Sequence, residues 1–190
     1  MGRLNMDETV GTAALDRWVR SFALLVAENK DLLTDLDAAI GDGDHGANMD
    51  RGMRAVVAAL DDTTPATAAA LFNKVGMTLV STVGGASGPL FGTFFLRVGA
   101  SLGDTAEISL AQLAAALRAG LEGIVARGKA EAGDKTIYDA LAPAVNALDS
   151  AVSEGVDKAD ALKLALVAAA MSSATVVAPG SWCPTLRSPR

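Results

Sequence analysis

Apolar residues recur along most of the chain at the three- and four-residue spacing that places them on one face of an α-helix. The first such run predicts a helix over residues 11–29, with Trp18 on its apolar face and in the core. A polar, glycine-rich stretch at residues 37–48 interrupts the pattern, and a second apolar run then predicts a helix over residues 49–60. The chain therefore begins as two helices joined by an acidic loop.

The same pattern continues to about residue 173. Thr64 as a cap and Pro65 as the first residue predict a third helix, which ends near Val83. A second glycine-rich segment, residues 84–89, leads into another helix, and the spacing of Ser109 and Gln112 matches a capping box that opens the next. The remaining apolar runs predict helices that end near Arg127 and that cover residues 138–148 and 157–173.

Composition supports an all-α fold. Of the 190 residues, 51% are hydrophobic but only 4% aromatic, and alanine and leucine dominate where a β-protein would need β-branched runs. We predict an antiparallel up-and-down helical bundle or barrel formed by residues 1–173, with residues 174–190, rich in Pro and Ser, as an irregular tail. If successive helices are antiparallel, three polar connections lie at the same end: residues 37–48, 84–89 and 127–136.

Charge and apolar run length exclude several classes of protein. A net charge of -6 without a basic patch disfavours nucleic-acid binding, which needs cations against the phosphates. The longest apolar run, residues 164–171, is too short to span a bilayer, and residues 1–6 lack the apolar core of a signal peptide. The single cysteine, Cys183, fits a reducing compartment. We therefore expect a cytoplasmic protein without a membrane span.

The acidic loop has the composition of a metal site. Gly43 separates Asp42 from Asp44 and lets the backbone turn so that both carboxylates converge, while Asp37 lies just upstream. Carboxylate oxygens favour Mg²⁺ over zinc, and Mg²⁺ commonly completes its shell with water and substrate phosphates. The calcium-binding EF-hand pattern fails, because its required glycine falls on Ala47.

An ordinary solvated turn is the alternative, and for the bare Asp-Gly-Asp tripeptide it is the commoner outcome. The larger cluster favours a site, because His45 and Asn48 lie beside the carboxylates at the start of a helix whose N–H groups attract anions. No Arg or Lys is expected near the loop, so a metal would have to supply the neutralising charge.

The segment at residues 84–89 is a candidate phosphate cradle. Small residues before a helix expose backbone N–H groups, and Ser87 adds a hydroxyl. It is not a P-loop, since the lysine and the preceding strand are both missing. Close helix packing explains such glycines equally well, and that alternative stays open.

Three stretches resemble one family. The pattern Asp37-x4-Asp42-x-Asp44-His45-Gly46-x-Asn48-Met49, residues 84–93 and residues 127–136 are similar to the ADP-binding subunit of phosphoenolpyruvate-dependent dihydroxyacetone kinase, which is also the C-terminal domain of ATP-dependent dihydroxyacetone kinases. The resemblance extends over about residues 15–170. A related fatty-acid kinase domain carries Thr in place of His45, so the histidine favours the dihydroxyacetone branch.

The resemblance implies an antiparallel barrel of eight helices with a metal and nucleotide site. By motif, Asp37, Asp42 and Asp44 would hold a pair of Mg²⁺ ions that bridge the phosphates of ADP or ATP. The residues that it implies for nucleotide binding are His45, Gly46, Ala47, Asn48, Ala86 and Ser87 on the phosphate side and Gly128 and Ile137 beside the adenosine. No catalytic side chain is assigned with certainty, which fits a phosphoryl transfer that depends on positioning and charge neutralisation.

The implied function is that of a glycerone (dihydroxyacetone) kinase subunit. It would transfer a phosphoryl group to dihydroxyacetone held on a partner subunit, and a phosphohistidine-carrying subunit would supply that group. The donor, phosphoenolpyruvate-derived or ATP, stays open, as does the oligomeric state, a homodimer included. A non-catalytic regulator with the same fold and an impaired nucleotide site is the alternative, and a phosphocarrier modified on His45 is a further rival.

The C-terminal end departs from the family. Relatives continue after the seventh helix with a basic, glycine-rich segment and a final helix that help to cover the nucleotide, whereas residues 172–190 match neither. The last helix of the family is therefore expected to be altered or absent here. We predict that metal binding survives and nucleotide retention is weakened.

Overall fold

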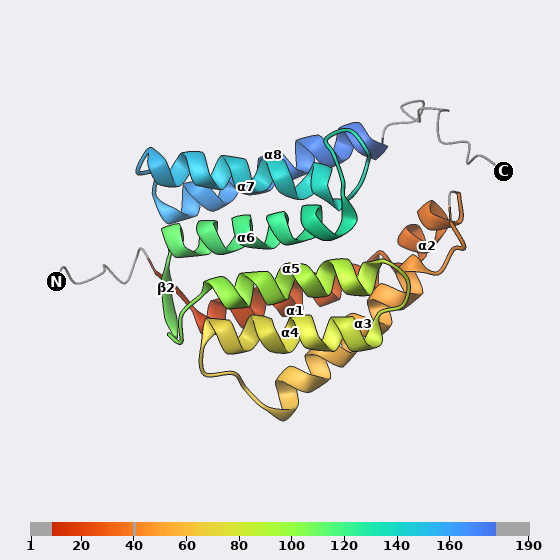
Figure 1. Cartoon of the computed structure of the whole chain (residues 1–190), viewed down its shortest axis with the longest axis horizontal. Helices are drawn as coiled ribbons and strands as arrows, with labels where there is room; N and C mark the ends of the chain where they lie inside the picture. The colour runs from red at the N-terminus through yellow and green to blue at the C-terminus, as the bar shows by residue number, and fades with distance from the viewer. Residues whose placement is uncertain (1–8, 40, 178–190) are drawn as a thin grey trace. The chain divides into compact units, whose positions relative to one another are not determined.

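Helices make up nearly all of the secondary structure in the computed structural model, which describes residues 9–39 and 41–177 (Figure 1). The chain divides into two compact units between Lys129 and Ala130. The helices of the first unit are α1 (Thr12–Glu28), α2 (Lys30–Ala38), α3 (His45–Asp62), α4 (Ala68–Thr82), α5 (Ser87–Ser101) and α6 (Leu110–Gly128). Those of the second unit are α7 (Ile137–Ser153) and α8 (Lys158–Val177). The prediction of an all-α fold is confirmed.

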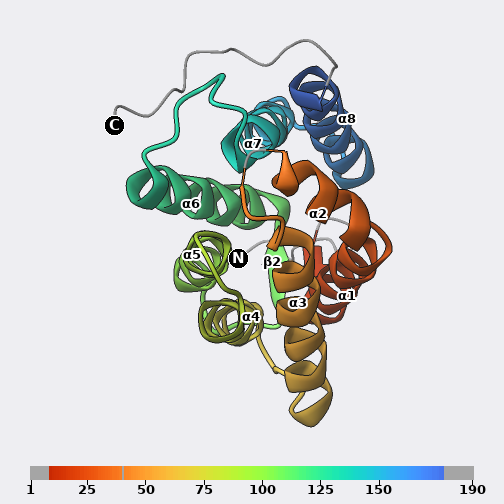
Figure 2. The ribbon, with the colours of Figure 1, turned by 90° about the vertical axis from the view of Figure 1, so that its right-hand side faces the viewer.

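Consecutive helices of the first unit pack against one another. Helix α3 contacts α4, α4 contacts α5 and α5 contacts α6, and α1 lies against α3. Figure 2 shows α4 and α5 end-on and side by side, with α3 running beside α4. In the second unit α7 and α8 pack together as a pair. This is the up-and-down packing of neighbours that the short connections predict.

The acidic loop is preceded by a helix that the apolar pattern did not predict. A separate nine-residue helix, α2, follows the break at Asn29, whose side chain donates to the Leu25 carbonyl at 2.8 Å. Asp37 therefore lies in the last turn of a helix and not in the loop itself. Helix α2 has only nine residues and follows α1 after the single residue Asn29, so no Gly or Pro marks a boundary between the two helices in the sequence.

Helix α4 begins three residues later than predicted. The cap is Thr67, whose hydroxyl oxygen accepts the N–H of Ala70 at 3.2 Å and donates to Asp104 at 3.0 Å. Thr64 and Pro65 precede the helix, so the predicted cap was wrong. Thr67 is the cap in place of Thr64 because Asp104, in the connection after α5, also holds its side chain.

Two capping boxes open helices in the second half of the chain. Ser109 and Gln112 form the predicted box at the start of α6. Thr136 and Asp139 form another at the start of α7, where the first turn also carries the acidic side chain that the helix dipole favours. Helix α7 then continues through Pro143 to Ser153.

Helix α8 continues to Val177, four residues past the predicted end of the helical domain. The rest of the predicted irregular tail, residues 178–190, lies outside the described residues, so its effect on the site stays a prediction. Within the described ranges, none of the helices combines the length and the apolar character that crossing a bilayer requires.

A two-stranded antiparallel sheet joins the starts of α1 and α6. Strand β1 (Thr9–Gly11) pairs with β2 (Glu107–Ser109), with Val10 opposite Ile108. Ile108 is fully buried, so this short ribbon closes one end of the core of the first unit. Strands of three residues are too short for an alternating pattern, and the sequence did not predict them.

Aromatic rings fill the middle of the first unit. Phe72 and Phe95 stack with their centroids 6.0 Å apart, and Phe94 meets Phe95 edge-on. Trp18 packs edge-on against Phe72 at 5.9 Å, yet 43% of its surface stays exposed. Trp18 therefore lies at the edge of the core, which corrects its predicted burial.

Candidate metal and phosphate site

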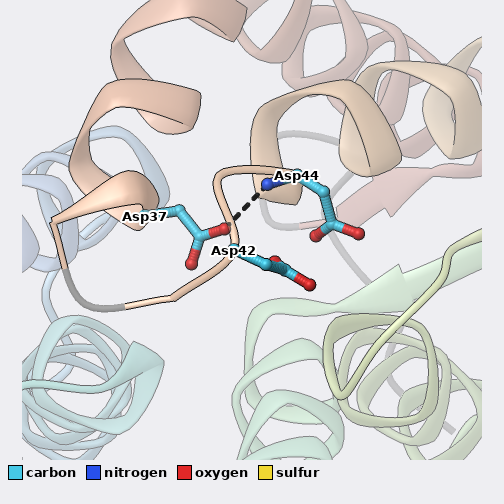
Figure 3. A group of neighbouring side chains, drawn as sticks. All are labelled: Asp37, Asp42 and Asp44. Carbon is cyan, nitrogen blue, oxygen red and sulfur yellow. Dashed lines mark hydrogen bonds between the residues drawn. The ribbon is translucent and has the colours of Figure 1, made fainter.

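Three carboxylates gather where α2 ends and α3 begins. Asp37 comes from the last turn of α2, and Asp42 and Asp44 come from the connection that leads into α3 (Figure 3). One carboxylate oxygen from each lies within 4.8 Å of the others. Gly43 has a φ of 72°, a left-handed conformation that glycine adopts without strain, and it turns the chain between the two later aspartates. The convergence predicted for this loop is present.

Asp37 also caps the following helix. Its Oδ2 accepts the N–H of Asp44 at 2.9 Å and the N–H of His45 at 3.2 Å, whereas the side chain of Asp44 makes no capping hydrogen bond. Figure 3 shows the first of these bonds crossing from α2 to the start of α3. One oxygen of Asp37 is thus committed to the backbone. The position of that carboxylate is thereby fixed relative to Asp44.

Gly46 allows α2 and α3 to approach this closely. A Cβ at this position would overlap the Lys30 carbonyl oxygen and lie 2.5 Å from Thr34 Oγ1 and 2.9 Å from Thr34 N. Only a glycine leaves room for the backbone of α2 over the first turn of α3. The structure gives Gly46 a packing role, and the nucleotide contact that the resemblance implies for it stays a prediction.

The second glycine-rich segment joins the same site. Ser87, the first residue of α5, lies with its Oγ 3.0 Å from Nδ1 of His45, the first residue of α3. Gly84 lies against Asn48, since an added Cβ would be 3.3 Å from Asn48 Nδ2. Two of the three polar connections therefore meet, as the up-and-down arrangement predicts.

The two connections enclose an open pocket of about 420 Å³. Its lining is acidic on the side of the aspartates and made of small residues on the other. The lining residues are Asp37, Gly41, Asp42, Asp44, His45, Asn48, Gly84, Gly85, Ala86 and Ser87. Seven of these are predicted site residues: Asp37, Asp42, Asp44, His45, Asn48, Ala86 and Ser87.

Four other predicted nucleotide residues do not line the pocket. Gly46 and Ala47 lie in the first turn of α3, with Gly46 buried. Gly128 ends α6 beside α5, because a Cβ there would lie 3.2 Å from Leu90 Cδ2. Ile137 is the first residue of α7 in the second unit, and its place beside the adenosine stays a prediction, as does that of Gly128.

The sequence left two roles open for the glycines of the 84–88 segment, a phosphate cradle and close helix packing, and the structure places glycines in positions that suit each. Gly85 has a φ of 64° and nothing within 4 Å of an added Cβ, so it shapes an open turn at the pocket. Gly88 is a packing residue, because a Cβ there would overlap the Val83 carbonyl oxygen. The pocket face and the helix contact are supplied by different glycines of one segment.

Arg51 is the polar residue that the sequence analysis missed. Its Nη2 donates to Asn48 Oδ1 at 2.7 Å, and its Nε donates to the carbonyl oxygen of Thr82 at 3.2 Å. The expectation that no Arg or Lys lies near the loop was therefore wrong. The three-residue spacing from Asn48 on a helix was the available signal, because such residues are neighbours on the helix surface.

The donor set suits a hard cation. The three clustered side chains offer only oxygen, and Asp37 keeps Oδ1 available after Oδ2 has accepted its two N–H bonds. Oxygen ligands of this kind are those of Mg²⁺, Mn²⁺ and Ca²⁺. Gly41 keeps Oδ1 accessible, because a Cβ at that position would overlap it.

Comparison with known protein families identifies one that covers most of the chain. The DAK2 domain family matches residues 39–176, which include the aspartates at 42 and 44, the segment at 84–89 and helices α3 to α7. The chain belongs to the DAK2 domain family. The resemblance predicted from the three motifs is thereby confirmed.

Curated DAK2 relatives include kinase subunits of similar sequence. Over 132 residues the chain is 51% identical to the ADP-binding subunit DhaL of PEP-dependent dihydroxyacetone kinase 1 from Listeria innocua, an alignment that covers 70% of this chain and 66% of the relative. It is 39% identical over 148 residues to the corresponding DhaL subunit from Escherichia coli, covering 78% of this chain and 70% of the relative. The aligned part thus spans about two thirds of these proteins.

A solved structure has the same fold. The dihydroxyacetone kinase from C. freundii, solved in complex with AMP-PNP and Mg²⁺, superposes with a TM-score of 0.73 at 26% identity. The match covers 95% of this chain and 32% of the longer kinase chain. This DAK2 chain therefore corresponds to one part of that enzyme.

Proposed function

We propose that this DAK2 protein is the nucleotide-binding subunit of a dihydroxyacetone kinase, with Mg²⁺ and ADP or ATP held in the pocket between the aspartates and the 84–88 segment. The observation that carries the proposal is the hydrogen bond between the Ser87 hydroxyl and His45 Nδ1, which joins an acidic cluster to a helix start in one cavity. The names of the bacterial relatives and the ligands of the C. freundii structure support it.

The proposal gives the two sides of the pocket different tasks. Asp37, Asp42 and Asp44 would hold Mg²⁺, two ions by the family resemblance, and the metal would supply positive charge against the phosphates. Asn48 and Ser87 would bind phosphate oxygens from the opposite side. The start of α5 adds backbone N–H groups, which attract anions.

The proposed reaction is phosphoryl transfer to dihydroxyacetone on a partner subunit. A hydroxyl oxygen of the triose forms a bond to the terminal phosphorus of ATP as the hydroxyl proton is released, and the bond from that phosphorus to ADP breaks. ADP stays on this subunit and accepts the next phosphoryl group from a phosphohistidine-carrying subunit, or leaves if ATP is the donor. A partner that binds the triose is required, because this subunit is proposed to hold the nucleotide only.

Calorimetric titration of ADP tests the nucleotide site. We expect binding with Mg²⁺ present, no binding with chelator, and at least tenfold weaker binding in Asp44→Asn, because one ligand of the metal is lost. Asp35→Asn is the matched control: it removes the same charge from exposed α2, away from the pocket lining, and should bind as the wild type does. The proposal would be refuted if the wild-type protein is folded but shows no ADP binding under any of these conditions.

Reconstitution tests the reaction. Mixed with a triose-binding subunit and a phosphohistidine-carrying subunit from a bacterial relative, the wild-type chain should form dihydroxyacetone phosphate. Nucleotide binding without product would refute the transfer step and favour a regulator. Acid-labile phosphate on His45 would instead show that the histidine carries the phosphoryl group.

A further inference from the structure

We propose that Arg51 is a positioning residue that orients the Asn48 amide, so that Asn48 presents its NH₂ group and not its carbonyl to the bound phosphates. This inference rests on the proposed function, because it assigns how one wall of the phosphate pocket is set. Arg51 itself is absent from the pocket lining and is exposed, so it would act through Asn48.

The chemistry of the guanidinium fixes the orientation of the amide. An arginine side chain has five N–H donors and no acceptor, so the Asn48 atom that faces Arg51 Nη2 at 2.7 Å must be the oxygen. The oxygen and nitrogen of an asparagine amide are usually assigned from such partners. Here the partner allows only one assignment.

The opposite end of the amide then faces the pocket. Asn48 is only 7% exposed and lines the cavity, and a Cβ on Gly84 would lie about equally far from its Nδ2 (3.3 Å) and its Oδ1 (3.4 Å). Because Oδ1 already accepts from Arg51, Nδ2 is the amide atom left to donate to a ligand in the pocket. Two N–H donors at this position suit an anion, whereas a carbonyl oxygen turned the same way would repel phosphate oxygens. Without Arg51 both orientations of the amide become available.

Arg51 also ties the amide to the segment across the pocket. Its Nε donates to the carbonyl of Thr82, the last residue of α4, where helix carbonyls lack partners within the helix. Gly84 follows two residues later. The one guanidinium therefore fixes Asn48 on α3 and the entry to the 84–88 segment in a common register.

A double-mutant cycle on MgADP affinity tests the inference. Arg51→Met should weaken binding about three- to tenfold, less than the full loss of a hydrogen bond to a charged group, because the Asn48 amide can still turn its NH₂ toward the phosphate. Asn48→Ala should weaken it by at least as much, and the double variant should bind no more weakly than Asn48→Ala alone, because Arg51 acts through Asn48. Losses that simply multiply would overturn the proposal. Arg17→Met, an exposed arginine of α1, is the charge-matched control and should bind as the wild type does.

Arg51→Lys separates orientation from charge and tests the case in which Arg51→Met fails to fold. Lysine keeps the positive charge, but its single nitrogen cannot reproduce the paired donation to Asn48 and Thr82. We expect a two- to fivefold loss of MgADP affinity with Mn²⁺ binding to the aspartates unchanged. Wild-type affinity in Arg51→Lys would show that charge alone suffices, and the proposal would fall.

A readout without nucleotide keeps this inference distinct from the proposed function. In the free wild-type protein, a scalar coupling across the hydrogen bond should connect the Arg51 guanidinium nitrogen to the side-chain carbonyl carbon of Asn48, and the coupling should be retained in Arg17→Met. Absence of this coupling in the wild type would overturn the orientation. If wild-type protein fails to bind MgADP while the coupling is present, the proposed function is wrong and the orientation stands.

Discussion

At the scale of single residues, two backbone features hold the three aspartates together: the left-handed turn at Gly43 and the N–H groups at the start of α3 that Asp37 accepts. Asp42 and Asp44 converge because Gly43 adopts a positive φ, and an Asp-Gly-Asp stretch indicates that directly. The capping of α3 by Asp37 was not predicted. Capping patterns relate residues about three positions apart, whereas Asp37 accepts N–H groups seven and eight residues later, after a turn of the chain.

Gly46→Ala tests how strictly the triad depends on the contact between α2 and α3. In an ordinary helical position this change stabilises a protein, by about 1 kcal/mol. Here the added Cβ overlaps the backbone of α2, so we expect destabilisation by about 1–3 kcal/mol in urea unfolding. Mg²⁺ affinity should fall as well, because Asp37 moves with α2.

Gly103→Ala is the matched control for Gly46→Ala. An added Cβ at Gly103 meets no atom within 4 Å, so stability and Mg²⁺ affinity should remain those of the wild type. Stability equal to or above the wild type in Gly46→Ala would show that α2 is not held against α3 as the structure has it.

At the scale of elements, long helices with a buried face were predicted and short or exposed elements were not. Helices α5 and α6 bury apolar residues along their length, so the apolar period predicts both, and the capping box of α6 agrees with it. Helix α2 has nine residues and is separated from α1 by neither Gly nor Pro, and the strands have three residues each, so the sequence does not set these elements apart from their neighbours. The start of α4 was misplaced because Thr64 and Thr67 are both good caps, and only the distant Asp104 distinguishes them.

The two threonines allow a direct test of where α4 begins. Thr67→Ala removes a capping acceptor and a bond to Asp104, so we expect the free energy of unfolding to fall by about 1 kcal/mol. Thr64→Ala makes the same chemical change three residues earlier, where no capping bond forms, and should leave stability within about 0.5 kcal/mol of wild type. The reverse ranking would favour the start predicted from the sequence.

At the scale of the whole molecule, composition predicted the all-α class, and short connections predicted that polar loops would gather at one end. That argument worked within the first unit, where residues 37–48 and 84–88 share a pocket. The bonds of Arg51 to Asn48 and Thr82 could not be predicted in this way. They require α3 and the end of α4 to be adjacent, and the adjacency of two helix surfaces follows from packing, which periodicity alone does not specify.

The linkage between the pocket and the stability of the whole chain gives a final prediction. A ligand that binds only the folded state at about a hundred times its dissociation constant stabilises that state by about 2.7 kcal/mol. For a chain of this length we expect MgADP to raise the midpoint of thermal unfolding by about 5–10 °C. Differential scanning calorimetry should show this shift in the wild type and Asp35→Asn, and about half of it or less in Asp44→Asn, because a tenfold loss of affinity leaves about 1.4 kcal/mol of stabilisation.

Because α2 buries no residue, its amides should open locally at low cost, and MgADP should slow their hydrogen exchange more than that of buried α4. Equal protection of both helices would show that the ligand does not tie α2 to the fold.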